Sequence, residues 1–394
     1  MRKRAAGRRV AAGLVVVAVA HAWVGLAGAD NPPGFIFTST PIPGAQPPGD
    51  ASTAADAAAG TTSGASVVLF AGDEGETWAY DAAAGSWSKQ TPSSGPDARS
   101  SQAMAPAPPS AGVDRALLYG GFQAPSTFLA DTWVWNDNTK DWTQACDACA
   151  PGGLARAMMA ASSTTTLLVD GSISAGFVNA VWRWDDASSN WIEVHPSGPG
   201  GFPAPRGDAQ LAYDGTNFVL YGGLSNGFQS FDDTWLLVDD GGGSFRWELA
   251  CSQCPPGPRS LGAFTPMGGA GTPAGAVLVG GELIDAQQQP PTKYYSDTWF
   301  WDGAARSWRQ LVAGSPLTAS TTDPNVPYSP SGGSIAGGAQ QAAGIVVDTR
   351  LSAGADDPRV ESNVLRWQAP VPPTPPSPPT APPTPISVVP RFTG

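Results

Sequence analysis

The chain has 394 residues, with 48 Gly, 40 Pro and 15 Trp, and only 14% of its residues are charged. This composition is typical of a large all-β domain rich in turns and argues against a helical protein. The formal net charge of −12 gives a surface that repels nucleic acid phosphates and anionic membranes, so we expect no nucleic acid binding.

The N-terminus has the pattern of an export signal. A basic start is followed by an apolar run over residues 10–20, and the small residues 27–29 precede Asp30. We predict a signal peptide over residues 1–29 and a secreted, extracellular or cell-wall protein with no membrane span after cleavage. An uncleaved anchor is the alternative, because residues 10–29 are nearly long enough to cross a bilayer.

A repeated unit begins after a short β-prone run at residues 35–38. Each copy has an apolar run, a glycine pair, a polar excursion, an aromatic run preceded by an acid, and a closing tryptophan. The third copy is degenerate, with Asp170-Gly171 in place of the pair. A period near 50 residues indicates a propeller or an array. The repeat positions that we expect to be structural are Gly120, Gly121, Trp133, Trp142, Gly222, Gly223, Trp235, Trp247, Gly280, Gly281, Trp299 and Trp308.

These units resemble the kelch-repeat family, the β-propellers that include the central domain of galactose oxidase. The resemblance rests on the glycine pairs, the closing tryptophans and a leading arginine, and it covers about residues 35–368. It departs from the family in units one and six, where the glycine pair or the closing tryptophan is missing, and no histidine follows the leading arginine. It implies an all-β propeller domain over residues 30–368. We assign Arg99, Arg156, Arg206 and Arg259 to one equivalent position.

Physical reasoning gives the repeated residues structural roles. Trp133 and Trp135 alternate with a residue on the opposite face of their strand, so both point the same way and can pack between neighbouring sheets. The glycines suit close approaches at strand ends. We expect the acid before each aromatic run to accept backbone donors in a turn. We expect the leading arginines to pair with acids across blades.

The sixth unit lacks an outer strand. It offers strands near residues 335–340, 344–347 and 363–367, and there a proline-rich tail begins. We therefore expect the run at residues 35–38 to supply the missing strand. This gives six four-stranded blades closed by an N-terminal strand.

Four cysteines form two CxxC pairs in equivalent loops, after the closing tryptophans of units two and four. Zinc is disfavoured because those units are not adjacent in a ring. A redox pair usually lies at a helix N-terminus, which is not expected here. In an exported chain the favoured interpretation is two local disulfides, Cys146–Cys149 and Cys251–Cys254. Rings this small remove little loop entropy and add little stability.

Catalytic motifs are scarce. After signal cleavage one histidine remains, His195, so the copper-radical chemistry of some kelch-superfamily oxidases is excluded, and no Ser/His/Asp arrangement can be built. Residues 72–78 resemble the Asp-box of sialidases, but this motif occurs once. We predict no catalytic site, no metal and no cofactor. The alternative is a glycosidase- or sialidase-like enzyme that uses arginines and carboxylates of the central channel.

The longest loops follow the glycine pairs, over residues 123–130, 224–232 and 283–296, and should share one rim. Loops on a rigid scaffold carry specificity, so we expect a monomeric scaffold that binds a protein or carbohydrate there. The tail over residues 369–394 is rich in Pro, Thr, Ser and Ala and favours an extended stalk. The contact candidates on the rim are Phe122, Phe128, Phe228, Tyr294 and Tyr295.

Overall fold

The structure is a computed structural model that describes residues 36–41, 43–45, 56–60, 66–72, 74–81, 83–108, 113–267, 274–284, 292–295, 297–312, 335–336, 343–349 and 360–368. The predicted signal peptide and proline-rich tail lie outside these residues. All regular elements in the described part are β-strands. A search of this part for an apolar helix long enough to cross a membrane finds none.

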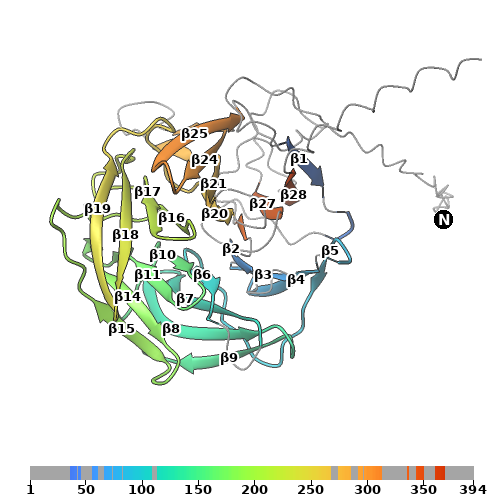
Figure 1. The fold of residues 1–394 in the computed structure, drawn as a ribbon. Helices are drawn as coiled ribbons and strands as arrows, with labels where there is room; N and C mark the ends of the chain where they lie inside the picture. Colours follow the sequence, from blue (N-terminus) through green and yellow to red (C-terminus); the bar gives the residue numbers. More distant parts are fainter. Residues whose placement is uncertain are drawn as a thin grey trace, which may run out of the picture.

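The strands form a ring of antiparallel sheets around a central axis (Figure 1). Five blades in the described part are each built from one continuous stretch of chain, with the strand order in the sheet following the sequence from the axis outward. The first two blades are β2 (Asp56–Gly60), β3 (Ser66–Ala71), β4 (Glu76–Asp81) and β5 (Ser86–Lys89), then β6 (Ala103–Pro106), β7 (Arg115–Gln123), β8 (Thr127–Asn136) and β9 (Asp141–Cys146). The third is β10 (Met158–Ala161), β11 (Thr166–Val169), β14 (Val181–Asp185) and β15 (Asn190–Val194). The fourth is β16 (Gln210–Tyr213), β17 (Phe218–Tyr221), β18 (Thr234–Gly241) and β19 (Ser244–Cys251), and the fifth is β20 (Ala263–Met267), β21 (Gly275–Val279), β24 (Thr298–Asp302) and β25 (Ser307–Val312).

Two small hairpins extend the third and fifth blades beyond their glycine positions. They are β12 (Ser172–Ile173) with β13 (Gly176–Phe177), and β22 (Glu282–Ile284) with β23 (Thr292–Tyr294).

A further four-stranded sheet joins the two ends of the chain. Its strands are β1 (Ile36–Pro41), β28 (Val360–Gln368), β27 (Ala343–Thr349) and β26 (Ile335–Ala336), in that order. The predicted N-terminal strand is present, because β1 pairs antiparallel with β28 and places Phe37 opposite Trp367. The predicted count of six blades is nevertheless corrected to five, since five units have the complete continuous four-strand path, whereas this sheet is assembled from segments far apart in the sequence.

The hydrophobic core lies between blades rather than inside them. A sheet has two faces to bury, and the ring lets each blade cover its neighbour. Trp142 and Trp135 of the second blade pack with Val68 and Phe70 of the first, and the rings of Phe70 and Trp142 meet edge to face at 6.3 Å. Trp133, on the same strand as Trp135, is partly buried and packs against this cluster too. Equivalent clusters join the second blade to the third, the third to the fourth and the fourth to the fifth.

The glycine pair allows the close approach of successive blades. Gly120 and Gly121 have φ of +59° and +106°, a region that favours glycine. A Cβ on Gly121 would lie 2.8 Å from the carbonyl oxygen of Ser100, and one on Gly120 would collide with the carbonyl of Leu154 in the next blade. The N–H of Gly121 donates to that Leu154 carbonyl at 2.9 Å. Glycine is therefore required by packing as well as by backbone shape.

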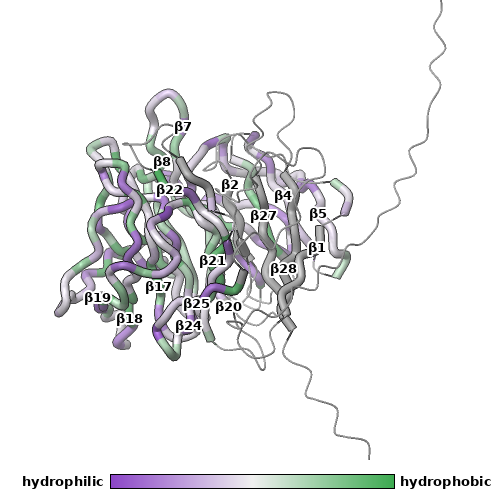
Figure 2. The backbone as a smooth tube through the Cα atoms, turned by 90° about the horizontal axis from the view of Figure 1, so that it is seen from above, coloured by the Kyte–Doolittle hydropathy of each residue, from purple (hydrophilic) through white to green (hydrophobic). Residues whose placement is uncertain are grey.

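Antiparallel order places several features on one face of the ring. The first and third strands of a blade begin where its second and fourth strands end. We call this the glycine face, because the glycine pairs end the second strands there. The edge-on view in Figure 2 shows the turn between β7 and β8 projecting on this face. The segments that lead into the inner strands, the described parts of the predicted rim loops and the CxxC loops all lie on it. Residues 285–291 and 296 of the third rim loop lie outside the described residues.

Candidate functional site

Three leading arginines are fully buried on the glycine face and are used within their own blades. Arg99 binds the carboxylate of Asp131 through both guanidinium nitrogens, at 2.5 and 2.8 Å, and also donates to the carbonyl of Gly120. Bidentate arginine–carboxylate pairs of this kind are strong and directional. The same arrangement joins Arg206 to Asp233 and Gly222, and Arg259 to Asp297 and Gly280.

These contacts correct two expectations from the sequence. Asp131, Asp233 and Asp297 accept from arginine rather than from the backbone of a turn, and Glu76 of the first blade accepts from Lys89 instead. These ion pairs lie within blades rather than across them. Each acid also accepts the indole N–H of the tryptophan two residues later, as Asp131 does from Trp133 at 2.7 Å. The repeated arginines and acids therefore fix the blade, and their hydrogen bonds leave them unavailable to a ligand.

Arg156 does not occupy the position that the sequence assigns to it. The carbonyl of Leu154 accepts from the second glycine of the preceding blade, as the carbonyls of Arg206 and Arg259 do. Leu154 is thus the equivalent of the leading arginines, and Arg156 lies two residues further along. The sequence places a leading arginine in four units, but only the backbone hydrogen bonds show which of these arginines occupy equivalent positions.

Arg156 belongs instead to an inner ring of equivalent residues, together with Ser101, Asp208 and Leu261. All four have φ between +53° and +57°. Three of them donate their N–H groups to the carbonyl of the equivalent residue in the preceding blade, with Arg156 to Ser101 at 2.9 Å, Asp208 to Arg156 at 3.2 Å and Leu261 to Asp208 at 2.9 Å. These positions immediately precede the innermost strands β6, β10, β16 and β20, so the inner ring borders the axis on the glycine face from the second blade to the fifth.

Three charged residues from successive blades lie at or beside the inner ring, and two of them form an ion pair. Arg156 Nη1 lies 2.9 Å from Asp208 Oδ2, and the Arg156 side chain is 40% exposed while that of Asp208 is buried. Glu282 follows the glycine pair of the fifth blade, and its backbone exchanges two hydrogen bonds of 2.8 Å with Ser260, next to Leu261 of the ring. We call Arg156, Asp208 and Glu282 the central charged cluster.

Burial and charge shift the pKa values of both acids in this cluster. Burial raises the pKa of Glu282 to about 7, and the carboxylate of Asp208 adds to the shift while Arg156 opposes it. Burial also raises the pKa of Asp208, and the adjacent Arg156 guanidinium limits that rise. Glu282 therefore exchanges a proton near neutral pH, which suits an acid–base group. Among the described residues no group of three His, Cys, Asp or Glu is placed to hold a metal ion.

The aromatic contact candidates do not form one patch. Phe122 and Phe128 pack against each other edge to face at 5.4 Å across β7 and β8. Tyr295 lies under the Arg259 guanidinium at 3.9 Å and donates its hydroxyl to the Pro258 carbonyl at 3.2 Å. Phe228 is 54% exposed in the loop before β18. The side chain of Tyr294 lies outside the described residues. Of the candidates whose side chains are described, Phe228 is the most available to a ligand.

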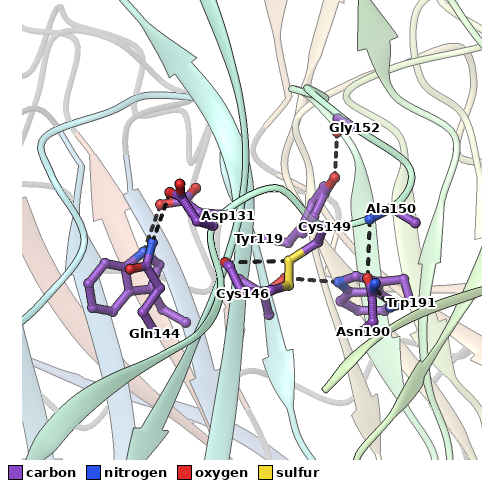
Figure 3. The surroundings of a disulfide bond; sticks show 12 residues. Tyr119, Asp131, Gln144, Cys146, Cys149, Ala150, Gly152, Asn190 and Trp191 are labelled. Atoms are coloured by element: carbon purple, nitrogen blue, oxygen red, sulfur yellow. Dashed lines mark hydrogen bonds between the residues drawn. A yellow bond between two sulfur atoms is a disulfide. The ribbon is translucent and has the colours of Figure 1, made fainter. Parts of the chain in front are cut away.

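The cysteines pair locally, as predicted. Cys146 pairs with Cys149, and Cys251 with Cys254, with 5.7 Å between Cα atoms in each pair (Figure 3). The first pair borders the core between the second and third blades, and the second pair borders the core between the fourth and fifth. His195 lies in the loop after β15 with an exposed side chain, 3.8 Å from Glu193. This placement supports neither a metal nor a catalytic role for His195.

Asp170 is a buried acid for which the sequence predicted no role. The sequence showed only that Asp170 replaces the first glycine of the pair in the third unit. It stands where the other blades have the first glycine, at φ +54°, and is 1% exposed. Neither carboxylate oxygen accepts a hydrogen bond of ordinary geometry. Burial raises its pKa well above the ordinary value, and Arg206 of the next blade and a weak hydrogen bond from the backbone of Ala180 oppose that shift. Glu282 was missed for a similar reason, since one acid after a glycine pair carries no motif.

Comparisons with known proteins support the fold. No protein-family model matches the chain. The tRNA wybutosine-synthesizing protein 4 of Emericella nidulans is 31% identical over 148 residues, which make up 34% of this chain and 13% of that protein. A solved structure described as "Structure of YjhT" has a TM-score of 0.58 at 13% identity, over 79% of this chain and 94% of that one. The chain therefore has a kelch-like β-propeller fold, and its activity is not decided by these likenesses.

Proposed function

We propose that this protein is an exported, non-catalytic kelch-type propeller of the galactose oxidase-like group that binds a protein or glycan through its glycine face. The contrast among its arginines carries the proposal. Arg99, Arg206 and Arg259 are sealed inside their blades by paired carboxylates. Arg156 has left that position and presents a 40% exposed guanidinium at the axis. Arg156 does not form the ion pair that holds the other blades together, and its exposed guanidinium is suited to binding a ligand.

The central charged cluster and the loops around it supply complementary contacts. Arg156 retains donors beyond its bond to Asp208 and can bind a carboxylate or the hydroxyl groups of a sugar. Phe228 adds an exposed apolar ring on the same face. Arginine and aromatic side chains are the residues that most often dominate binding energy, each contributing more than about 1 kcal/mol when they anchor a contact.

Closure of the ring belongs to the same proposal. We propose that the composite sheet of β1, β28, β27 and β26 closes the ring of five blades, because β26 contacts both β2 of the first blade and β20 of the fifth. The signal pattern and local disulfides support secretion as a monomer, with a proline-rich stalk after the domain. The fungal relative's name concerns tRNA modification, but a net charge of −12 disfavours an RNA ligand.

A second candidate function is a glycosidase-like enzyme, and the pKa of Glu282 is the observation that favours it. A carboxyl group with a pKa of about 7 can donate or accept a proton at neutral pH. Asp208 and Arg156 would then position a sugar beside it. This alternative requires turnover as well as binding.

Binding is tested by capture on a glycan array and by secretome pull-down with the purified propeller. Arg156→Ala should weaken binding at least about 10-fold, in line with the loss of an anchoring arginine. Arg306→Ala is the matched control, because Arg306 is 50% exposed in the turn between β24 and β25, on the opposite face. Equal affinity of both variants would refute the assignment of the site. The wild-type protein is also tested for hydrolysis of a panel of glycosides. Hydrolysis that is lost in Glu282→Gln while binding persists would favour the enzyme over the non-catalytic scaffold.

A further inference from the structure

Each CxxC pair has one sulfur atom that receives a hydrogen bond from a buried threonine. Thr132 Oγ1 lies 3.0 Å from Cys149 Sγ, and the indole N–H of Trp191 donates to the same Oγ1 at 3.0 Å. An indole nitrogen can only donate, so Thr132 accepts from Trp191. The hydroxyl hydrogen of Thr132 is then left for the sulfur. The direction of the Thr132–Cys149 hydrogen bond follows from the tryptophan.

The second pair repeats this arrangement. Thr234 Oγ1 lies 2.9 Å from Cys254 Sγ and accepts the indole N–H of Trp308 at 2.8 Å. The first blade has the same tryptophan-to-threonine bond, from Trp142 to Thr77 at 2.9 Å, without a cysteine pair beside it. The sulfur-directed hydroxyl is thus specific to the two loops that carry CxxC.

The loops are held by bonds that do not involve the disulfide. The N–H of Cys149 donates to Ala130 at 2.9 Å, and the N–H of Gly152 donates to Cys149 at 2.8 Å. Tyr119 also donates its hydroxyl to Gly152, and the Ala150 N–H donates to Asn190 at 3.1 Å (Figure 3). Closing a ring of only four residues removes little chain entropy. Reduction of the pair should therefore leave the loop and the blade in place.

The two sulfurs of each pair differ in burial. Cys149 and Cys254 are 2% and 4% exposed, whereas Cys146 and Cys251 are half-buried. The two residues between each pair of cysteines are exposed. An incoming thiol therefore meets Cys146 or Cys251, and the buried, threonine-bonded sulfur is the one that leaves.

We propose that both CxxC pairs are thiol–disulfide exchange sites that oxidise dithiols. A substrate thiolate attacks Cys146 Sγ, which forms a mixed disulfide and releases Cys149 as a thiolate. The second substrate thiolate attacks the substrate sulfur of that mixed disulfide and releases Cys146. The substrate loses two electrons and becomes a disulfide, and the CxxC pair gains two electrons and two protons. Burial disfavours the departing Cys149 thiolate, and the hydrogen bond from Thr132 offsets that cost, so that the leaving group departs faster than it would without the threonine.

The rate of exchange tests this role of the threonines. Dithiothreitol is added to the native full chain, and reduced cysteines are trapped with N-ethylmaleimide and counted by mass spectrometry. All four cysteines should react while near-ultraviolet circular dichroism is retained. The double variant Thr132→Val with Thr234→Val should react about 10-fold more slowly, the effect of one lost hydrogen bond to a charged group. The corresponding serine variants should keep the wild-type rate.

Thr77→Val is the matched control, because it loses the same tryptophan bond with no sulfur nearby. Equal rates in the valine variants and this control would overturn the proposal, as would cysteines that react only when the chain unfolds. The order of attack has its own test with glutathione disulfide. Cys149→Ala should form a mixed disulfide at Cys146 at least about 10-fold faster than Cys146→Ala does at Cys149, because only the former leaves the accessible thiol. Equal rates would refute the assignment of the attacked sulfur.

Discussion

Replacing Asp170 by glycine should stabilise the domain, because it restores the residue that the repeat requires at this position. Asp170 has φ +54° and is 1% exposed, and its carboxylate oxygens lack hydrogen bonds of ordinary geometry. An unpaired buried polar group costs about 1–3 kcal/mol. Glycine removes this cost and fits the positive φ, although it gives the unfolded chain about 0.5–1 kcal/mol more entropy. We expect a net gain of about 1–2 kcal/mol.

The pH dependence of this gain identifies its cause. Burial raises the pKa of Asp170 above its ordinary value of 3.8, so the folded state holds the proton more tightly than the unfolded state. The contribution of Asp170 to stability is therefore fully present below pH 3.8 and is lost as the pH rises through the folded pKa. The advantage of Asp170→Gly should grow from pH 4 upward. Asp170→Asn, which does not titrate, should also lack this pH dependence.

Thermal unfolding followed by circular dichroism between pH 4 and pH 8 measures the effect. At neutral pH the expected gain corresponds to a rise in Tm of about 1–3 °C for a domain of this size. Asp147→Gly, a change at an exposed acid in a loop, is the control and should leave the pH dependence unchanged. A lower Tm for Asp170→Gly than for the wild type at pH 7 would refute the argument, and so would a difference that stays constant between pH 4 and pH 8.

Three further predictions follow from the same packing and electrostatics. Arg206→Lys should lower the free energy of unfolding in urea by about 2–4 kcal/mol, because lysine cannot make the bidentate bond to Asp233. A change below about 0.5 kcal/mol would contradict a structural role for Arg206. Deleting residues 34–40 removes most of β1 and should lower the Tm of the whole domain in one transition, whereas an unchanged Tm would show that β1 does not close the ring. Ligand affinity should change between pH 6 and pH 8 as Glu282 titrates, and calorimetry should find no such pH dependence in Glu282→Gln. A pH dependence that persists in this variant would show that another group titrates.

The repeated residues made the architecture predictable from the sequence. Apolar runs, glycine pairs and closing tryptophans recur because each blade meets the same geometry, as the cluster around Trp142 and Phe70 illustrates. The local pairing of Cys146 with Cys149 was also predictable, because a separation of three residues needs no tertiary information. The sequence also indicated the N-terminal strand, which the structure pairs with β28.

The candidate site was far less predictable, because it depends on register and on contacts between blades. Arg156 resembles the leading arginines in the sequence, but a displacement of two residues moves it from a blade interior to the inner ring. Glu282 carries no local motif, and its pKa is raised first by burial and then by Asp208 of another blade, while Arg156 opposes the shift. The acids before the aromatic runs looked like turn residues because their arginine partners lie 27 to 38 residues away.

The sequence by itself determined the blade, since the strands, their glycine ends and their tryptophans follow from local periodicity and side-chain volume. Only the tertiary structure decided which charged side chains are buried in ion pairs within a blade and which are exposed to a ligand. Arg206 and Arg156 differ in that respect because one meets a carboxylate of its own blade and the other meets Asp208 of the next. Burial and the electric field of neighbouring groups set their roles, and both depend on how the blades are assembled around the axis.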